Sequence, residues 1–297
     1  MTLKSLFATQ VVSRRNAVKI LILGCGQAGL KVAEQAKAKG WEVIGTTTTE
    51  GRVAEIEAVC DKAVVVLGSD REGVKAAAEG VDAIVVSVSP SAVRSAKKED
   101  RGPIYQEVLV ESGLSASAAH DRVIFMSSIS VYGDGTQESG QFLTEATPRA
   151  INDEPSTIFF SAGEDAAMQA AHGTVLRLPD IYSADSDFGE RVQLAHEYMG
   201  GSTPFDRADA YHPIHVEDVA RAVIHILEND VEGRYNVVPD GVVPAPTVGD
   251  FWDKIADKTG QEKLEFRGEI RTPVQQSTSE KFRATGFEFK HQISEVV

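Results

Sequence analysis

The chain has 297 residues, 42% of them hydrophobic, and its apolar runs are too short to span a membrane. Its 44 acidic and 30 basic residues give a net charge of −14, which opposes non-specific attraction to nucleic acid and to anionic membranes. We therefore expect a protein with a sizeable core and a small-molecule substrate, with no nucleic-acid or membrane partner. A homodimer is left open.

The two cysteines, Cys25 and Cys60, are too few for a disulfide scaffold, so we interpret them as reduced thiols in the cytoplasm, without a redox role for Cys25. The first 33 residues contain no Asp or Glu but several Lys and Arg. We predict that residues 1–17 form a flexible leader. If they are a transit peptide instead, the protein belongs in an organelle stroma or matrix.

Between residues 18 and 180, short apolar runs alternate with amphipathic stretches. The expected strands are 18–23, 41–46, 62–67, 83–88, 122–127 and 174–178, and the expected helices are 30–39, 53–59, 72–79 and 104–119. This alternation predicts an α/β fold with a Rossmann-type doubly wound parallel sheet. Residues 133–163, rich in Gly, Asp, Glu, Thr and Pro, are predicted to form a long loop near the cofactor end of the sheet.

After residue 180 the alternation of apolar runs and amphipathic stretches becomes less regular. It predicts a turn at 183–187, a helix at 216–229, a strand at 234–238 and a helix at 247–259. We predict a dinucleotide-binding domain at 18–180 and a smaller substrate lobe at 181–297, some segments of which return to the main sheet.

Residues 20–33 read ILILGCGQAGLKVA, an apolar run followed by three glycines and a helix-forming stretch. Gly24 permits a tight turn, Gly26 lets the backbone approach a phosphate, and Gly29 lets the helix pack on the strand. The free N–H groups of the helix then face the anion, at Gln27 and Ala28. We predict a dinucleotide pyrophosphate here; the alternative is a strand-to-helix turn without a ligand.

Several stretches in order carry a resemblance. They are GCGQAG at 24–29, GWEVIGTTTTEGR at 40–52, GSD at 68–70, SSISVYGD at 127–134, LRLPDIY at 176–182 and HPIHVEDVARAV at 212–223. Together they resemble the extended short-chain dehydrogenase/reductase superfamily, also called the NAD-dependent epimerase/dehydratase group, and specifically its atypical YeeZ-like members. The resemblance covers almost the whole chain after residue 17 and implies a nicotinamide dinucleotide cofactor.

The cofactor type depends on the end of the second strand. Relatives specific for NAD place an acidic side chain there, about 18 residues beyond the last loop glycine, where this chain has Thr47. Arg52 lies close behind, and its planar fork of donors suits a 2′-phosphate. NADP is therefore the first choice. NAD stays open because Glu50 offers a carboxylate nearby.

Further cofactor contacts follow from the resemblance. It implies that Asp70 accepts a hydrogen bond from adenine, and that Ser87, Val88 and Ser127, at the ends of the fourth and fifth strands, lie along the dinucleotide. The alternative for Asp70 and the serines is a solvated turn and ordinary loop positions.

The resemblance also points to the catalytic position. Ser128 aligns with the catalytic serine of the superfamily, or else forms a structural turn. The usual Tyr and Lys of a YxxxK dyad fall on Phe160 and Glu164 in the best register, and neither side chain can act as a phenol–ammonium pair. The chain contains no YxxxK sequence at all.

Other side chains are candidates near the same site. Tyr132 is either a substitute acid or a ring packed under the loop. Tyr182 and His215 are placed on the substrate side, while Asp218 is expected at a helix N-terminus. Without HExxH, paired CxxC or a carboxylate cluster at ligand spacing, no metal site is expected.

These observations favour an NAD(P)-dependent oxidoreductase or epimerase that acts on a small carbonyl or nucleotide-sugar-like substrate. The alternative is a non-catalytic NADP(H)-binding sensor or assembly module.

Overall fold

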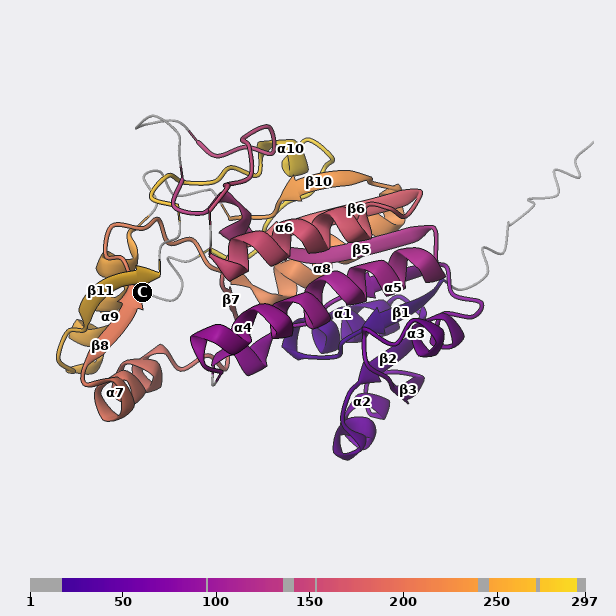
Figure 1. Cartoon of the computed structure of the whole chain (residues 1–297), viewed down its shortest axis with the longest axis horizontal. Coiled ribbons are helices and arrows are strands. Elements are labelled where there is room, and N and C mark those ends of the chain that lie inside the picture. The colour runs from indigo at the N-terminus through magenta and orange to yellow at the C-terminus, as the bar shows by residue number, and fades with distance from the viewer. Residues whose placement is uncertain are drawn as a thin grey trace, which may run out of the picture.

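The computed structural model describes residues 18–94, 96–135, 142–152, 154–239, 246–270 and 273–292, so the expected leader at 1–17 lies outside the described residues. Its centre is a seven-stranded parallel sheet in the order β10-β6-β5-β4-β1-β2-β3 (Figure 1). The strands are β1 (Lys19–Leu23), β2 (Glu42–Thr47), β3 (Lys62–Val65), β4 (Ala83–Val86), β5 (Arg122–Ser128), β6 (His172–Leu178) and β10 (Gly233–Asn236).

The strand order reverses next to β1, because the chain first winds outward to β3 and then returns to β4 on the other side. In open α/β sheets, ligands bind at this reversal, outside the carboxyl ends of the strands. The order confirms the predicted Rossmann-type doubly wound fold and places the candidate site at the ends of β1, β2, β4 and β5.

Helices cover both faces of the sheet, which explains why its inner strands are almost continuously apolar. Ile20 and Ile22 face one core, whereas Leu21 and Leu23 face the other. The first core is shared by α1 (Gln27–Ala38), α2 (Val53–Glu57) and α8 (Val216–Asn229). The second is covered by α3 (Arg71–Ala77), α5 (Ser112–Ala119) and α6 (Pro155–Ala167).

Two expected elements differ from the structure. The helix expected at 104–119 begins earlier, as α4 (Lys98–Tyr105), and continues through the π-helical η3 (Gln106–Glu111) into α5. The prediction of a loop at 133–163 is wrong at its end, because α6 begins at Pro155. Proline is favoured in a first helical turn, where its missing N–H would have no partner anyway.

Beyond β6, further elements form a smaller apolar core. It is built by α7 (Phe188–Met199), β8 (Ser202–Phe205), α9 (Val248–Thr259) and β11 (Glu265–Ile270), with Phe188, Val192 and Phe251 inside it. The short strands β7 (Ile181–Tyr182) and β9 (Ile214–His215) pair with each other, and α10 (Glu280–Arg283) packs near β10. In the described ranges we find no helix both long and apolar enough to cross a membrane.

Candidate functional site

The glycine loop follows β1 at the centre of the sheet. Gly24 has a φ of +93°, and a Cβ there would lie 3.1 Å from the carbonyl oxygen of Ser87 and from the Cα of Val88. Its N–H donates to the Thr46 hydroxyl at 2.8 Å. Glycine is therefore required both by the backbone conformation and by the close approach of the β4 end.

The other two glycines of the loop differ from each other. Gly26 is exposed at the N-cap of α1, no side chain caps the helix, and no atom lies within 4 Å of the position of a Cβ. A Cβ on Gly29 would lie 2.5 Å from the Gly24 carbonyl oxygen. Gly29 thus permits packing, whereas the space over Gly26 is open toward the first-turn amides of Gln27 and Ala28, as an anion site requires.

The loop is joined to the region after β2 by Arg52. Its guanidinium donates to the Cys25 carbonyl at 2.9 Å and forms two hydrogen bonds of 2.9 Å with the Glu55 carboxylate. The Glu55 carboxylate raises the pKa of Arg52, and Arg52 in turn lowers the pKa of Glu55. Thr47, buried at the end of β2, accepts a hydrogen bond from the Thr49 N–H at 3.1 Å.

The other expected cofactor residues lie at neighbouring loop positions. Asp70 is the N-cap of α3, where its carboxylate accepts from the Gly73 N–H at 3.0 Å. Ser87 is partly buried and its N–H donates to Leu23 at 2.9 Å, which continues the β4–β1 pairing. Capping uses one of the two carboxylate oxygens of Asp70, so it is compatible with a contact to adenine, which stays a prediction.

Ser128 is the last residue of β5 and forms a turn, which was the alternative to a catalytic role in the sequence analysis. Its hydroxyl accepts from the Ser130 N–H at 3.1 Å and lies 2.7 Å from the Ser130 hydroxyl. Thr157, in the first turn of α6, donates to the Ser130 carbonyl at 3.0 Å. The structure thus brings Ser130 to Ser128, and Thr157 to Ser130. Sequence reasoning missed both, although the serine-rich run at 127–130 pointed to Ser130.

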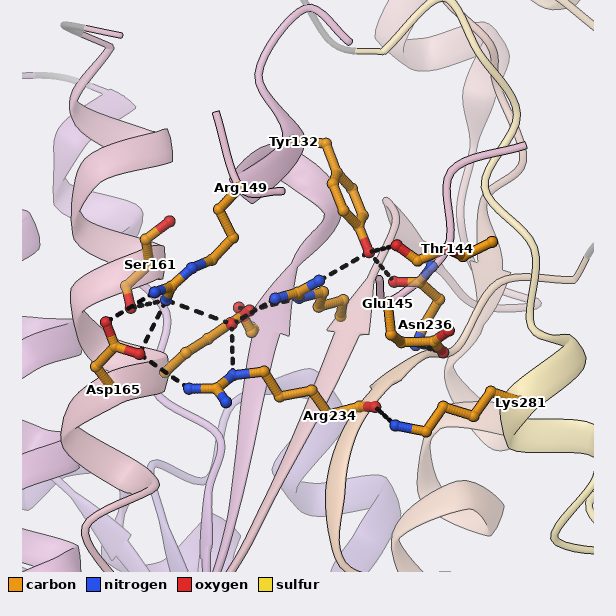
Figure 2. A network of polar contacts seen from close by, with 12 residues as sticks. Tyr132, Thr144, Glu145, Arg149, Ser161, Asp165, Arg234, Asn236 and Lys281 are labelled. Carbon is orange, nitrogen blue, oxygen red and sulfur yellow. Dashed lines mark hydrogen bonds and ion pairs between the residues drawn. The ribbon is translucent and has the colours of Figure 1, made fainter. Parts of the chain in front are cut away.

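Glu164 is fully buried and belongs to an ion-pair network. Figure 2 shows this network, in which Arg149 and Arg234 both point toward Asp165. It accepts two hydrogen bonds of 2.9 Å from Arg177 and one of 2.8 Å from the Ser127 hydroxyl. Arg234 and Arg149 lie 3.3 and 3.8 Å from the same carboxylate and both also pair with the neighbouring Asp165. Glu164 therefore balances the charge of the buried Arg177 and of two partly exposed arginines, and the Ser127 side chain points to it.

Tyr132 belongs to the same network. Its ring is 2% exposed, and its hydroxyl accepts from Arg177 at 2.8 Å. The Asn236 side-chain oxygen, at 2.7 Å, and the Thr144 carbonyl, at 2.9 Å, are the acceptors within reach of its proton. Burial raises the pKa of Tyr132, against an opposing effect of Arg177. This arrangement favours the packed role over that of a substitute acid.

The sequence matches the NAD dependent epimerase/dehydratase family over residues 20–238, a range that includes the glycine loop and the Ser128 turn. The chain belongs to this family. Protein YeeZ of Escherichia coli (strain K12) is 26% identical over 264 residues, which cover 85% of this chain and 88% of YeeZ. The family resemblance expected from the ordered motifs is confirmed.

Solved structures share the fold of this family member. A UDP-glucose 4-epimerase of Thermotoga maritima with UDP-glucose has a TM-score of 0.73 at 19% identity, covering 94% of this chain and 96% of that one. A Thermus thermophilus UDP-glucose 4-epimerase in complex with NAD has a TM-score of 0.69 at 21% identity, covering 92% and 94%.

On the far side of the site, Tyr182 and His215 come from the paired strands β7 and β9. Both are buried, and their rings meet edge to face at 5.0 Å. The Gln27 side chain donates to the hydroxyl of Ser183 at 3.1 Å, which joins the glycine loop to the end of β7. The structure therefore brings the expected substrate-side residues near the loop.

His215 also caps α8, since its Nδ1 accepts from the Glu217 N–H at 3.3 Å. Burial, and next the neighbouring His291, lower the pKa of His215. Asp218 is fully buried; it pairs with Arg221 at 2.6 Å and accepts from the His291 N–H at 2.9 Å. Asp218 is thus a structural anchor for the chain that follows α10.

One group of side chains has the composition of a metal site. The ligand atoms of His215, Glu217 and His291 all lie within 4.8 Å of one another. The two imidazole rings, however, are stacked with centroids 4.0 Å apart and planes 21° from parallel. The lone pairs of nearly parallel stacked rings do not converge on one ion, so we assign no metal to this group.

Proposed function

We propose that this family member binds a nicotinamide dinucleotide along the carboxyl ends of β1, β2, β4 and β5, with its pyrophosphate at the N-terminus of α1. The observation that carries the proposal is the open space over Gly26 in front of an uncapped helix. The Thermus thermophilus epimerase, whose fold is similar, was solved in complex with NAD, which supports the same class of cofactor.

NADP is the proposed form of the cofactor. Thr47 offers no carboxylate to the ribose hydroxyls, and Arg52 lies beside the loop with its side chain 37% exposed. The 2′-phosphate would replace Glu55 as one partner of the guanidinium, since both anions match its planar fork.

Calorimetry with NADPH and NADH tests this choice. Because a hydrogen bond to a charged group contributes about 1.5–3 kcal/mol, Arg52→Ala should weaken NADPH about 10- to 100-fold and leave NADH nearly unchanged. Arg207→Ala is the matched control, since Arg207 is an exposed arginine that pairs with Asp253 of α9, away from the glycine loop. Equal losses for both coenzymes would contradict the phosphate assignment.

For the reaction, we propose oxidoreduction or epimerisation of a small carbonyl or nucleotide-sugar-like substrate. The coenzyme, when bound, would accept or supply the hydride. Ser128 would hold the substrate oxygen, with its hydroxyl oriented by Ser130. Residues 181–297 would form the substrate lobe, apart from α8 and β10, which belong to the main sheet and its core. Tyr182 and His215 would line the contact of this lobe with the cofactor domain.

A second candidate is a non-catalytic NADP(H)-binding module. The pairing of Glu164 and of the Tyr132 hydroxyl with the buried Arg177 favours this candidate, since it occupies both groups that could transfer a proton. Absorbance of NADPH with a panel of carbonyl compounds separates the two. Turnover that is lost in Ser128→Ala supports the enzyme, whereas tight NADPH binding without turnover supports the module.

We further propose a cytoplasmic location with a small molecule as the partner. The free, buried state of both cysteines is consistent with a reducing compartment.

A further inference from the structure

Cys25 and Cys60, which are 35 positions apart in the sequence, meet behind the glycine loop. Cys25 lies in the loop itself, and Cys60 follows α2. Gly45 of β2 lies between them: a Cβ there would be 2.7 Å from the Cys25 Sγ and 2.8 Å from the Cys60 Sγ. Both sulfur atoms therefore border the space that the missing side chain at position 45 leaves open.

Both cysteines are buried: Cys25 is 1% exposed and Cys60 is 5% exposed. Both belong to the same apolar core. Their environments differ. The Cys60 thiol lowers the pKa of Cys25; burial opposes this, and a backbone hydrogen bond at Thr46 and the Arg52 guanidinium lower the pKa further. Cys25 and burial raise the pKa of Cys60. We therefore take Cys25, the thiol of the pair whose pKa is lowered, as the nucleophile.

The sequence alone predicts no redox role for Cys25, but the proximity of Cys60 changes this interpretation. We propose that Cys25 and Cys60 are a peroxide-sensitive dithiol, and that its closure to a disulfide weakens dinucleotide binding at the glycine loop. The second half of this proposal rests on the proposed function. The first half concerns the thiols alone.

The chemistry uses a hydroperoxide as oxidant. The Cys25 thiolate attacks one oxygen of hydrogen peroxide, and the O–O bond breaks. Cys25 becomes a sulfenic acid, and the departing hydroxide takes up a proton and leaves as water. The Cys60 thiol then attacks the Cys25 sulfur, the S–O bond breaks, and a second water carries away the hydroxyl and the proton. The two cysteines are oxidised by two electrons in total, and the peroxide is reduced.

The loop backbone transmits the change. The Cys25 N–H donates to the Thr46 carbonyl at 2.9 Å, and its carbonyl accepts from Arg52 at 2.9 Å. A disulfide brings its sulfur atoms to about 2.05 Å, closer than two thiols in contact, so closure must draw Cys25 and Cys60 toward each other. This movement displaces the loop and Arg52 together, and both face the proposed coenzyme.

The coupling is reciprocal. If the disulfide weakens coenzyme binding by a given factor, bound coenzyme must disfavour the disulfide by the same factor. NADPH should therefore protect the thiols from peroxide.

The first measurement is the covalent state of the full-length chain after treatment with hydrogen peroxide. We expect intact mass spectrometry to show the loss of two hydrogen atoms, and peptide mapping without reductant to join the segments that contain Cys25 and Cys60. Cys60→Ala should instead stop at the sulfenic or sulfinic acid of Cys25. Two thiols that stay titratable, or disulfides only between chains, would overturn the proposal.

The second measurement is the affinity for NADPH before and after oxidation. We expect a loss of about tenfold or more, reversed by dithiothreitol and absent in Cys60→Ala, whose side chain lies outside the binding loop. An internal disulfide without any change in affinity would refute the coupling. If the reduced protein bound neither coenzyme, the proposed function would fail while the mass measurement still decided the thiol pair.

Discussion

Substitutions at Gly26 and Gly29 should have different consequences, although both glycines belong to one motif. Gly26 has a φ of −78° and a ψ of −165°, a conformation open to any residue, and a Cβ there meets no atom within 4 Å. Gly26→Val should therefore fold, with a loss of about 1 kcal/mol or less from the weaker N-cap.

The same substitution should abolish dinucleotide binding. The valine methyl groups would occupy the space in which a phosphate must approach the amides of Gln27 and Ala28. Each charge-assisted hydrogen bond contributes about 1.5–3 kcal/mol, so the loss of two costs about 3–6 kcal/mol, more than 100-fold in Kd. Isothermal calorimetry with NADPH, alongside urea unfolding, measures both effects.

Gly29→Ala is the informative comparison. Its Cβ would lie 2.5 Å from the Gly24 carbonyl oxygen, a backbone atom that cannot yield without moving the loop. We expect a loss of about 1–3 kcal/mol in the free energy of unfolding together with weaker binding. Wild-type affinity in a folded Gly26→Val protein would refute the placement of the pyrophosphate. Unfolding of Gly26→Val itself would refute the open space.

Three further predictions follow from charged groups. Glu55→Gln removes the carboxylate that holds Arg52, so NADPH should bind more tightly while NADH does not; a similar gain for both coenzymes would speak against a phosphate contact. Glu164→Gln leaves the buried Arg177 without its counter-charge, so urea melts should show a loss of about 3–5 kcal/mol in the free energy of unfolding. A loss under about 1 kcal/mol would contradict the role of the network. Acid should destabilise the protein below about pH 6.5, because the pKa of His215 is lowered in the folded state and the unfolded chain takes up the proton first. In a plot of the unfolding midpoint against pH, His215→Gln should reduce the slope below about pH 6.5. An unchanged slope would contradict the role of His215.

The Glu164 network also changes how the missing dyad should be tested. A YxxxK dyad would require Tyr at position 160 and Lys at position 164. In the structure, Lys at position 164 would bury a further positive charge among Arg149, Arg177 and Arg234. We expect Glu164→Lys to unfold the protein, so loss of activity in that variant carries no information about catalysis.

The sequence alone is sufficient to predict the parallel sheet, the glycine loop and the family, because these depend on local patterns. Buried strands between two layers of helices must be apolar throughout, and a phosphate loop needs glycines at short, regular spacing. The same local reasoning failed at α6, where the composition of residues 133–163 concealed a helix that begins at Pro155.

Contacts between distant residues were decided by the tertiary structure. In the sequence Glu164 is only the replacement of a catalytic lysine, yet folding surrounds it with arginines from β6, β10 and the chain before α6. Cys25 and Cys60 are two unrelated thiols in the sequence, yet β2 brings them together over Gly45. Local propensity depends on neighbours in the chain, whereas charge pairing and thiol contact depend on distances that exist only once the strands have been ordered in the sheet.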